Sequence, residues 1–185
     1  MNSNLEFLQQ RNSAPKLTSP GPSEHELAEM FQAAVRAPDH AWLRPWRFLT
    51  IEGERRNAFG ELLCDALVKR KPETDEAARI KVRSSPLRAP LLIVSIVKFK
   101  EHPKVPRSEQ RLSAGCAAHA LLLAAEALGY AGVWRTGDSA FDPVVMQGLG
   151  LASDEEIIGF LYVGTREGKA KPLPAIDAQS LVSAY

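Results

Sequence analysis

The stretch SEQRLSAGCAAHALLLAAEAL, from Ser108 to Leu128, is the longest helical pattern in the chain. Its middle is apolar nearly all round, and Gly129 stands where a glycine would end the helix. A helix without a polar face is expected to be buried on every side. In a chain of only 185 residues, such burial predicts that a second subunit covers one side of the helix.

Two strongly apolar runs lie on either side of this helix in the sequence, LLIVSIV at 91–97 and IIGFLYV at 157–163. Nearly continuous apolar runs of this length predict strands that are covered on both faces. Two further segments also predict strands, the alternating RFLTIE at 47–52 and the short run at 132–135.

Helical patterns alternate with these strands. Ser23-Glu24-His25-Glu26 fits a capping box that begins one helix, residues 55–69 form a second, and Asp142-Pro143 begins a short third. Residues 4–11 fit a further short helix with its apolar side chains inward. The alternation predicts one domain, residues 1–185, with a central sheet covered by helices on both faces. It does not fix the directions in which the strands pair.

The charge balance and the cysteines exclude several classes of function. A net charge of +1 gives no global field that would recruit nucleic acid or an anionic membrane. Cys64 and Cys116 form neither a CxxC pair nor a disulfide framework. The first ten residues carry no secretory signal, and the longest apolar stretch, 112–128, is shorter than the ~20 residues of a membrane span. We therefore expect a cytoplasmic protein.

The familiar catalytic motifs are absent from the sequence. There is no P-loop and no GxSxG elbow, and Gly148-Leu149-Gly150 follows a helix rather than the strand that a dinucleotide loop needs. The four histidines show no zinc-binding spacing, so no metal site is expected. His119, on an apolar helix, is most simply a hydrogen-bonded core or interface histidine.

Basic and polar groups instead gather in loops and at helix ends, beside prolines and tryptophans. They form the segments Arg11-Asn12-Ser13, Arg36-Ala37-Pro38-Asp39-His40, Arg44-Pro45-Trp46 and Trp134-Arg135-Thr136. Each has a purely structural explanation when taken alone. Arg11 and Arg36 would favour the C-terminal ends of their helices, and Asp39 would form a turn.

In their order along the chain, these segments match a known family. The matching stretches are Arg11-Asn12-Ser13-Ala14, RAPDH at 36–40, PWRFLTIEGE at 45–54, RAPLLIV at 88–94, KVPRSEQRLSAGCA at 104–117, GVWRTG at 132–137 and IIGFLYVGT at 157–165. They cover nearly the whole chain, and RAPDH followed by PW and later by WRTG is a specific combination. By these motifs the sequence resembles the nitroreductase family, in particular its short YdjA-type members.

The resemblance implies an α+β fold, a three-layer α/β/α sandwich with a mixed, largely antiparallel sheet. It also implies an interlocked homodimer in which long central helices meet and residues 166–185 extend over the partner subunit. FMN would lie at the interface, held by both chains. A shared interface agrees with the helix at 108–128, whose apolar pattern independently predicts a partner.

The family's flavin-binding residues are carried over by position. Arg11, Asn12 and Ser13 match the segment that grips the flavin phosphate and ribityl chain, a task that suits the fork of a guanidinium. Lys169 matches a basic residue near the phosphate.

Five further residues match positions around the flavin ring system. Arg36 and His40 correspond to residues that the other subunit supplies. Trp134, Arg135 and Thr136 correspond to the loop along the isoalloxazine, where hydrogen-bond donors meet its polar edge.

Three positions depart from the family's pattern. Asn12 replaces a second arginine, which removes one charge at the phosphate and is expected to weaken FMN binding. Arg44 stands where many relatives have glutamine, and we expect it to alter the pocket and its preferred substrates. Thr136 replaces a serine and keeps the hydroxyl.

The chemistry that the resemblance implies is two-electron transfer by a ping-pong mechanism. NADH or NADPH passes a hydride to flavin N5, and a nitroaromatic or quinone acceptor then takes the electrons at the same place. Because FMN carries this chemistry, no catalytic side chain is assigned. Two alternatives stay open: a flavin-dependent reductase or dehydrogenase of another physiological substrate, and a non-catalytic flavin-binding protein of the same fold.

Overall fold

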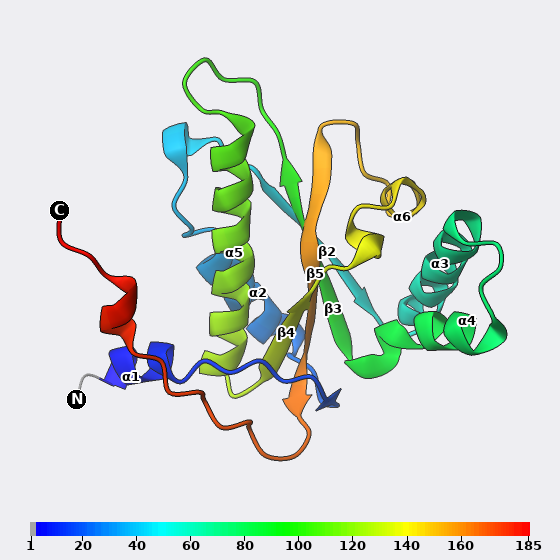
Figure 1. The fold of residues 1–185 in the computed structure, drawn as a ribbon, viewed down its shortest axis with the longest axis horizontal. Coiled ribbons are helices and arrows are strands. Elements are labelled where there is room, and N and C mark those ends of the chain that lie inside the picture. The colour runs from blue at the N-terminus through cyan, green and yellow to red at the C-terminus, as the bar shows by residue number, and fades with distance from the viewer. Residues whose placement is uncertain (1–2) are drawn as a thin grey trace.

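The computed structural model describes residues 3–185 as a sheet between two layers of helices (Figure 1). The strands are β1 (Leu17–Thr18), β2 (Trp46–Glu52), β3 (Leu91–Lys98), β4 (Ala131–Arg135) and β5 (Glu155–Arg166). β5 is central: it pairs with β1, β3 and β4, and β2 pairs with β3. Every one of these pairs is antiparallel, which confirms a largely antiparallel sheet. Residues 3–185 contain no parallel pair, so the expectation of a mixed sheet is wrong for them.

Helices cover both faces of the sheet, which confirms the three-layer α+β sandwich. The α-helices are α1 (Ser3–Gln9), α2 (Glu24–Ala34), α3 (Arg55–Arg70), α4 (Glu76–Arg83), α5 (Arg107–Ala127) and α6 (Pro143–Gly148). Single 3-10 turns are η1 (His40–Trp42), η2 (Ser85–Arg88), η3 (Asp138–Ala140) and η4 (Ala178–Leu181). α2 and α5 lie on one side of the sheet, and α3, α4 and α6 lie on the other (Figure 1).

The alternation of side chains along β3 explains why both layers are needed. Leu91 and Ile93 pack with Leu121 of α5 in one buried cluster, while Leu92 and Val94 join a second cluster on the opposite face. All four strand residues are buried. The prediction of a strand covered on both faces is therefore confirmed.

The start of α2 follows the predicted capping box. The backbone N–H of Ser23 donates to the Glu26 carboxylate at 2.8 Å, and the Ser23 hydroxyl accepts from the backbone N–H of Glu26 at 3.3 Å. The Tyr130 hydroxyl also donates to the Glu26 carboxylate at 2.9 Å, which ties this helix end to the loop before β4.

The outer face of α5 remains open in the single chain. Ala114 and Leu121 are fully buried against the sheet, but Leu112 is 71% exposed, and Cys116 and His119 are exposed as well. The expectation of burial on every side is therefore not met within one chain. An apolar helix face of this kind is typical of an interface.

The N-terminal helix and the C-terminal tail lie together at the edge of the molecule (Figure 1). α1 ends at Gln9, earlier than expected, and none of its residues is buried, so its inward-facing side chains were wrongly predicted for the isolated chain. The tail beyond Arg166 is exposed throughout, including Ile176 at 70% and Leu181 at 78%.

No helix within residues 3–185 combines the length and the apolar character that crossing a membrane requires.

Candidate functional site

The loop after α1 is fastened to the start of the C-terminal tail. The Arg11 guanidinium donates to the Ser13 hydroxyl at 3.3 Å, the Asn12 amide donates to the carbonyl of Lys171 at 2.6 Å, and Arg166 donates to the carbonyl of Asn12 at 2.9 Å. Segments more than 150 positions apart in sequence thus form one unit. The sequence-predicted Arg11, Asn12 and Ser13 lie within it.

A small, strongly basic cavity of about 170 Å³ opens beside this unit. Its charged lining consists of Lys16, Arg166, Lys169, Lys171 and the single carboxylate Glu167. No ion pair within residues 3–185 ends on any of these four cations. Several unpaired cations around one cavity are suited to a phosphate group.

Lys169 was predicted from the sequence, and the structure places it in this cavity. Lys16, Arg166 and Lys171 were missed. The only available signal was local basic composition: Lys16 follows the Arg11-Asn12-Ser13 segment closely, and Lys171 is two positions from Lys169.

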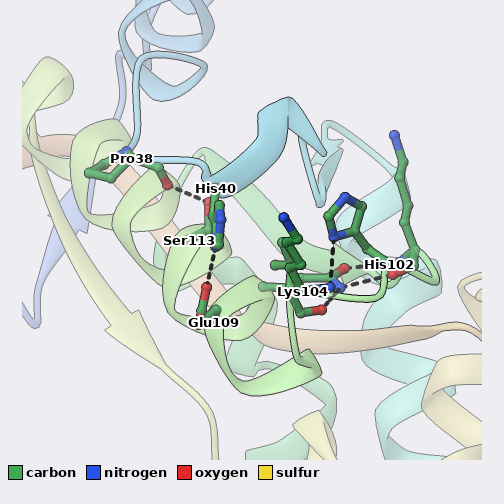
Figure 2. Close-up of polar contacts among 9 residues, drawn as sticks. Pro38, His40, His102, Lys104, Glu109 and Ser113 are labelled. Carbon is green, nitrogen blue, oxygen red and sulfur yellow. Dashed lines mark hydrogen bonds and ion pairs between the residues drawn. The ribbon is translucent and has the colours of Figure 1, made fainter.

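The loop after α2 is held against α5 by two polar contacts (Figure 2). The Ser113 hydroxyl donates to the carbonyl of Pro38 at 2.5 Å, and His40 Nδ1 lies 2.8 Å from Glu109 Oε2. Ser113 and Glu109 lie one turn apart on α5, so both contacts use the same side of the helix. They fix the position of the RAPDH segment.

The second histidine in Figure 2, His102, makes its hydrogen bond within the loop that precedes α5. His102 Nδ1 accepts from the backbone N–H of Lys104 at 3.2 Å. The buried Gln110 amide donates to the carbonyl of Lys100 and accepts from its backbone N–H, both at 2.9 Å. These contacts shape the turn before α5, and none of them reaches the RAPDH segment.

A larger cavity of about 770 Å³ lies on the open face of α5. It is lined mainly by apolar groups from α5, together with the end of α2, the loop after it and two strand residues; Arg36, Pro38, Leu112, His119 and Trp134 are among them. Of the predicted site residues, Arg36 and Trp134 are thus brought to one cavity. His119 lines it too and is exposed in the single chain, so its interpretation as a core histidine is wrong and the interface histidine stays a prediction.

Trp134 and Arg135 lie on opposite faces of β4. The Trp134 ring packs on the α5 side and its Nε1 donates to the carbonyl of Ile158 at 3.3 Å. The Arg135 guanidinium lies 5.5 Å from the ring centre of Tyr162, on the α3 side. Thr136 follows the strand and is exposed. These three neighbours do not form one lining in the isolated chain, because strand residues alternate in direction.

Arg135 carries an unpaired buried atom. Its Nε is inaccessible to solvent and has no hydrogen-bond partner among the described residues. A buried donor without a partner is rare in proteins.

The basic cavity and the α5 cavity share no lining residue. Within one chain the structure therefore brings Arg11, Asn12, Ser13 and Lys169 into one group and Arg36 and Trp134 into another. His40 lies beside the second group through its contact with α5.

Known proteins resemble this chain over nearly its whole length. The model described as "Nitroreductase family" matches residues 8–165. The chain is 43% identical over 166 residues to "Putative NAD(P)H nitroreductase YdjA" of Escherichia coli (strain K12), which covers 90% of each protein.

Solved structures share the fold. A nitroreductase-like family protein from Bacillus cereus superimposes with a TM-score of 0.86 at 22% identity, covering 100% of this chain and 97% of that one. A nitroreductase with bound FMN from Bacteroides fragilis superimposes with a TM-score of 0.76 at 20% identity, covering 100% of both. With the family model spanning residues 8–165, this chain belongs to the nitroreductase family.

Proposed function

We propose that the protein is an FMN-dependent oxidoreductase that passes two electrons from NADH or NADPH to nitroaromatic or quinone acceptors by a ping-pong mechanism. The observation that carries the proposal is the basic cavity beside Arg11-Asn12-Ser13. Family membership, the E. coli relative named for NAD(P)H nitroreductase activity and the FMN-bound structure from Bacteroides fragilis support it.

The residues present fit the groups of FMN. Lys16, Lys169 and Lys171 supply unpaired ammonium groups for the phosphate, and Arg11 supplies a guanidinium next to them in the same unit. The unpartnered Nε of Arg135 lies on the face of β4 opposite Trp134, so Arg135 does not line the α5 cavity with the other proposed ring-binding residues. Asn12 contributes no charge, and its amide is engaged by the tail.

We propose that two copies of the chain form a homodimer and share each flavin site. The open apolar face of α5 and the exposed Ile176 and Leu181 of the tail support this, because such surfaces are rarely left in water. Arg36 and His40 of one subunit would then serve the flavin that Arg11 of the other subunit holds. Residues 166–185 would extend over the partner.

FMN supplies the hydride and electron chemistry when it is bound. The chain's own residues bind and orient: the lysines would hold the phosphate, Trp134 would offer a flat apolar surface, and Arg36 from the other copy of the chain would place positive charge beside the ring system. The open cavity leaves room for the donor and then the acceptor to lie against the same ring face. We further propose that the protein works in the cytoplasm, where its two free cysteines would stay reduced.

Reconstitution of the purified protein with FMN tests this function. We expect a bound flavin, and steady-state oxidation of NADH or NADPH that a nitroaromatic acceptor accelerates. A flavin bound without any turnover would favour a non-catalytic binding protein. Turnover with donors but with neither nitroaromatics nor quinones would favour a reductase of another substrate.

A further inference from the structure

A third cavity, of about 580 Å³, adjoins the α5 cavity at the end of α2. Arg36 and Ala37 line both. The rest of its lining includes two tryptophans and a second arginine, namely Trp42, Trp46 and Arg44. Its size lies within the range of small-molecule sites, and its position places it beside the proposed flavin site.

The loop that builds this cavity has an unusual backbone. Ala41, Trp42 and Arg44 have φ values of 59°, 57° and 48°, in the left-handed region that favours glycine. A left-handed backbone at a residue other than glycine is strained, and residues of this kind cluster at functional sites. The Asp39 carboxylate accepts from the backbone N–H of Arg44 at 2.7 Å and helps to hold the turn.

Three side chains of this cavity, those of Arg36, Trp42 and Arg44, are open to a ligand. Trp42 is 78% exposed, although an indole of this size is normally packed. Within residues 3–185, no hydrogen bond or ion pair ends on the guanidinium of Arg36 or Arg44. Arg47 and Arg111, by contrast, each form a two-pronged contact with a glutamate.

The cavity therefore combines a free guanidinium with aromatic surfaces. A guanidinium binds a carboxylate through two parallel hydrogen bonds, and an indole offers its face to a flat ring. The lining holds one carboxylate, Asp39, which already serves the backbone of Arg44. Two guanidiniums against one carboxylate leave a positive balance, which favours an anionic ligand.

We propose that this cavity, which shares Arg36 and Ala37 with the α5 cavity, binds the carboxylate-bearing part of the electron acceptor and so selects aromatic compounds that carry a carboxylate. Arg44 is the residue that recognises the anion, and Trp42 is a stacking surface. The inference rests on the proposed flavin function, because it assigns the substrate class of that same site. Arg44 is here a specificity-determining residue that contacts the acceptor.

The test compares two acceptors of nearly the same shape, the anionic 4-nitrobenzoate and the neutral 4-nitrobenzamide. We expect the FMN-loaded protein to have a kcat/KM for 4-nitrobenzoate about tenfold above that for 4-nitrobenzamide, as a charge-assisted hydrogen bond would give. Arg44→Gln should abolish this ratio, chiefly through KM. Arg55→Gln, which removes an exposed arginine from the far side of the sheet, should keep it.

Calorimetric titration of the FMN-loaded protein with benzoate, and with benzamide as the control ligand, supplies a readout without turnover. We expect benzoate to bind about tenfold more tightly than benzamide and Arg44→Gln to remove the difference. If benzoate binds in this way while neither nitro compound is reduced, the carboxylate site at Arg44 is supported and the proposed reductase function is contradicted. Equal binding of the two ligands, or an Arg44→Gln protein impaired equally with both acceptors, would overturn the inference.

Discussion

His40 Nδ1 lies 2.8 Å from Glu109 Oε2, so the loop after α2 is tied to the N-terminal half of α5. The hydroxyl of Ser113, one turn further along α5, holds the carbonyl of Pro38 in the same loop. The helix that carries the open apolar face therefore also positions Arg36 and His40. In the proposed dimer, packing of α5 against its partner would set the position of these residues at the flavin.

Removing the Glu109 carboxylate should loosen this loop. Both side chains are about half exposed, so the pair adds little to global stability. We expect Glu109→Ala to weaken FMN binding several-fold with no more than about 1 kcal/mol lost in unfolding free energy. Glu109→Gln, which keeps an acceptor for His40, should bind FMN nearly as the wild type does. Fluorescence titration with FMN measures this, and equal affinities for all three proteins would show that the contact does not position His40.

A charge on the open face of α5 should prevent assembly. Leu112 is 71% exposed in the single chain and lines the apolar cavity. We expect Leu112→Glu to give a folded monomer at low micromolar concentration in sedimentation velocity, because an unpaired carboxylate would be buried at the interface. Ile80→Glu, on a 55% exposed position of α4, is the matched control and should leave the dimer intact. A wild-type protein that is itself monomeric would contradict the shared site.

Arg11 should contribute directly to FMN affinity. Its guanidinium lies in the unit that borders the basic cavity, so we expect Arg11→Ala to weaken FMN binding by about 1.5–3 kcal/mol. Titration of the apoprotein with FMN measures this loss, and Arg55→Ala, at an exposed position, is the control. An unchanged dissociation constant would mean that Arg11 serves only its own loop. Asn12→Arg should tighten FMN binding, because it adds a cation near the phosphate. An unchanged FMN affinity would indicate that Lys169 or Lys171 already supplies that cation.

The ion pair between Arg47 and Glu155 should make stability depend on acid pH. Glu155 is buried, and the hydrogen bonds from Arg47 hold the pKa of its carboxyl below the ordinary value of 4.5. The ionised carboxylate therefore stabilises the fold above pH 4.5, and this contribution is lost as the pH falls through the lowered pKa. Glu155→Gln should lose about 2–3 kcal/mol at pH 7 and show a flatter pH dependence below pH 5, measured by urea unfolding.

Its neighbour in the chain provides the control for that experiment. Glu156 is more exposed, and Arg111 likewise lowers the pKa of its carboxyl. Glu156→Gln should cost less than about 1 kcal/mol at pH 7, because water screens an exposed pair. Similar losses for the two variants would contradict the assignment of the buried pair as the stabilising one.

Much of the fold could be predicted from local patterns. The capping box at Ser23 predicts the start of α2, because its hydrogen bonds join residues only three positions apart. The apolar run LLIVSIV at 91–97 predicts β3, because a strand that is buried on both faces needs apolar residues at every position. The antiparallel pairing could not be derived from the residues alone, because an apolar run is equally compatible with either direction. The antiparallel pairing was predicted only from the resemblance to the nitroreductase family.

The site was less predictable because it depends on contacts between distant segments. The basic cavity joins residues near position 16 to residues near position 170, and no sequence spacing encodes that meeting. The left-handed backbone at Trp42 and Arg44 was not foreseen, because the segment contains no glycine. The opposite directions of Trp134 and Arg135, by contrast, follow from the period of two along the predicted strand.

Anaerobic reduction of the purified, FMN-loaded protein tests the central claim most directly. We predict that one equivalent of NADH or NADPH bleaches the flavin absorbance near about 450 nm, and that subsequent addition of a nitroaromatic or quinone restores it without oxygen. Two separable half-reactions at one bound flavin would establish the proposed ping-pong oxidoreductase. A bound flavin that neither nucleotide reduces, while dithionite reduces it fully, would contradict the account.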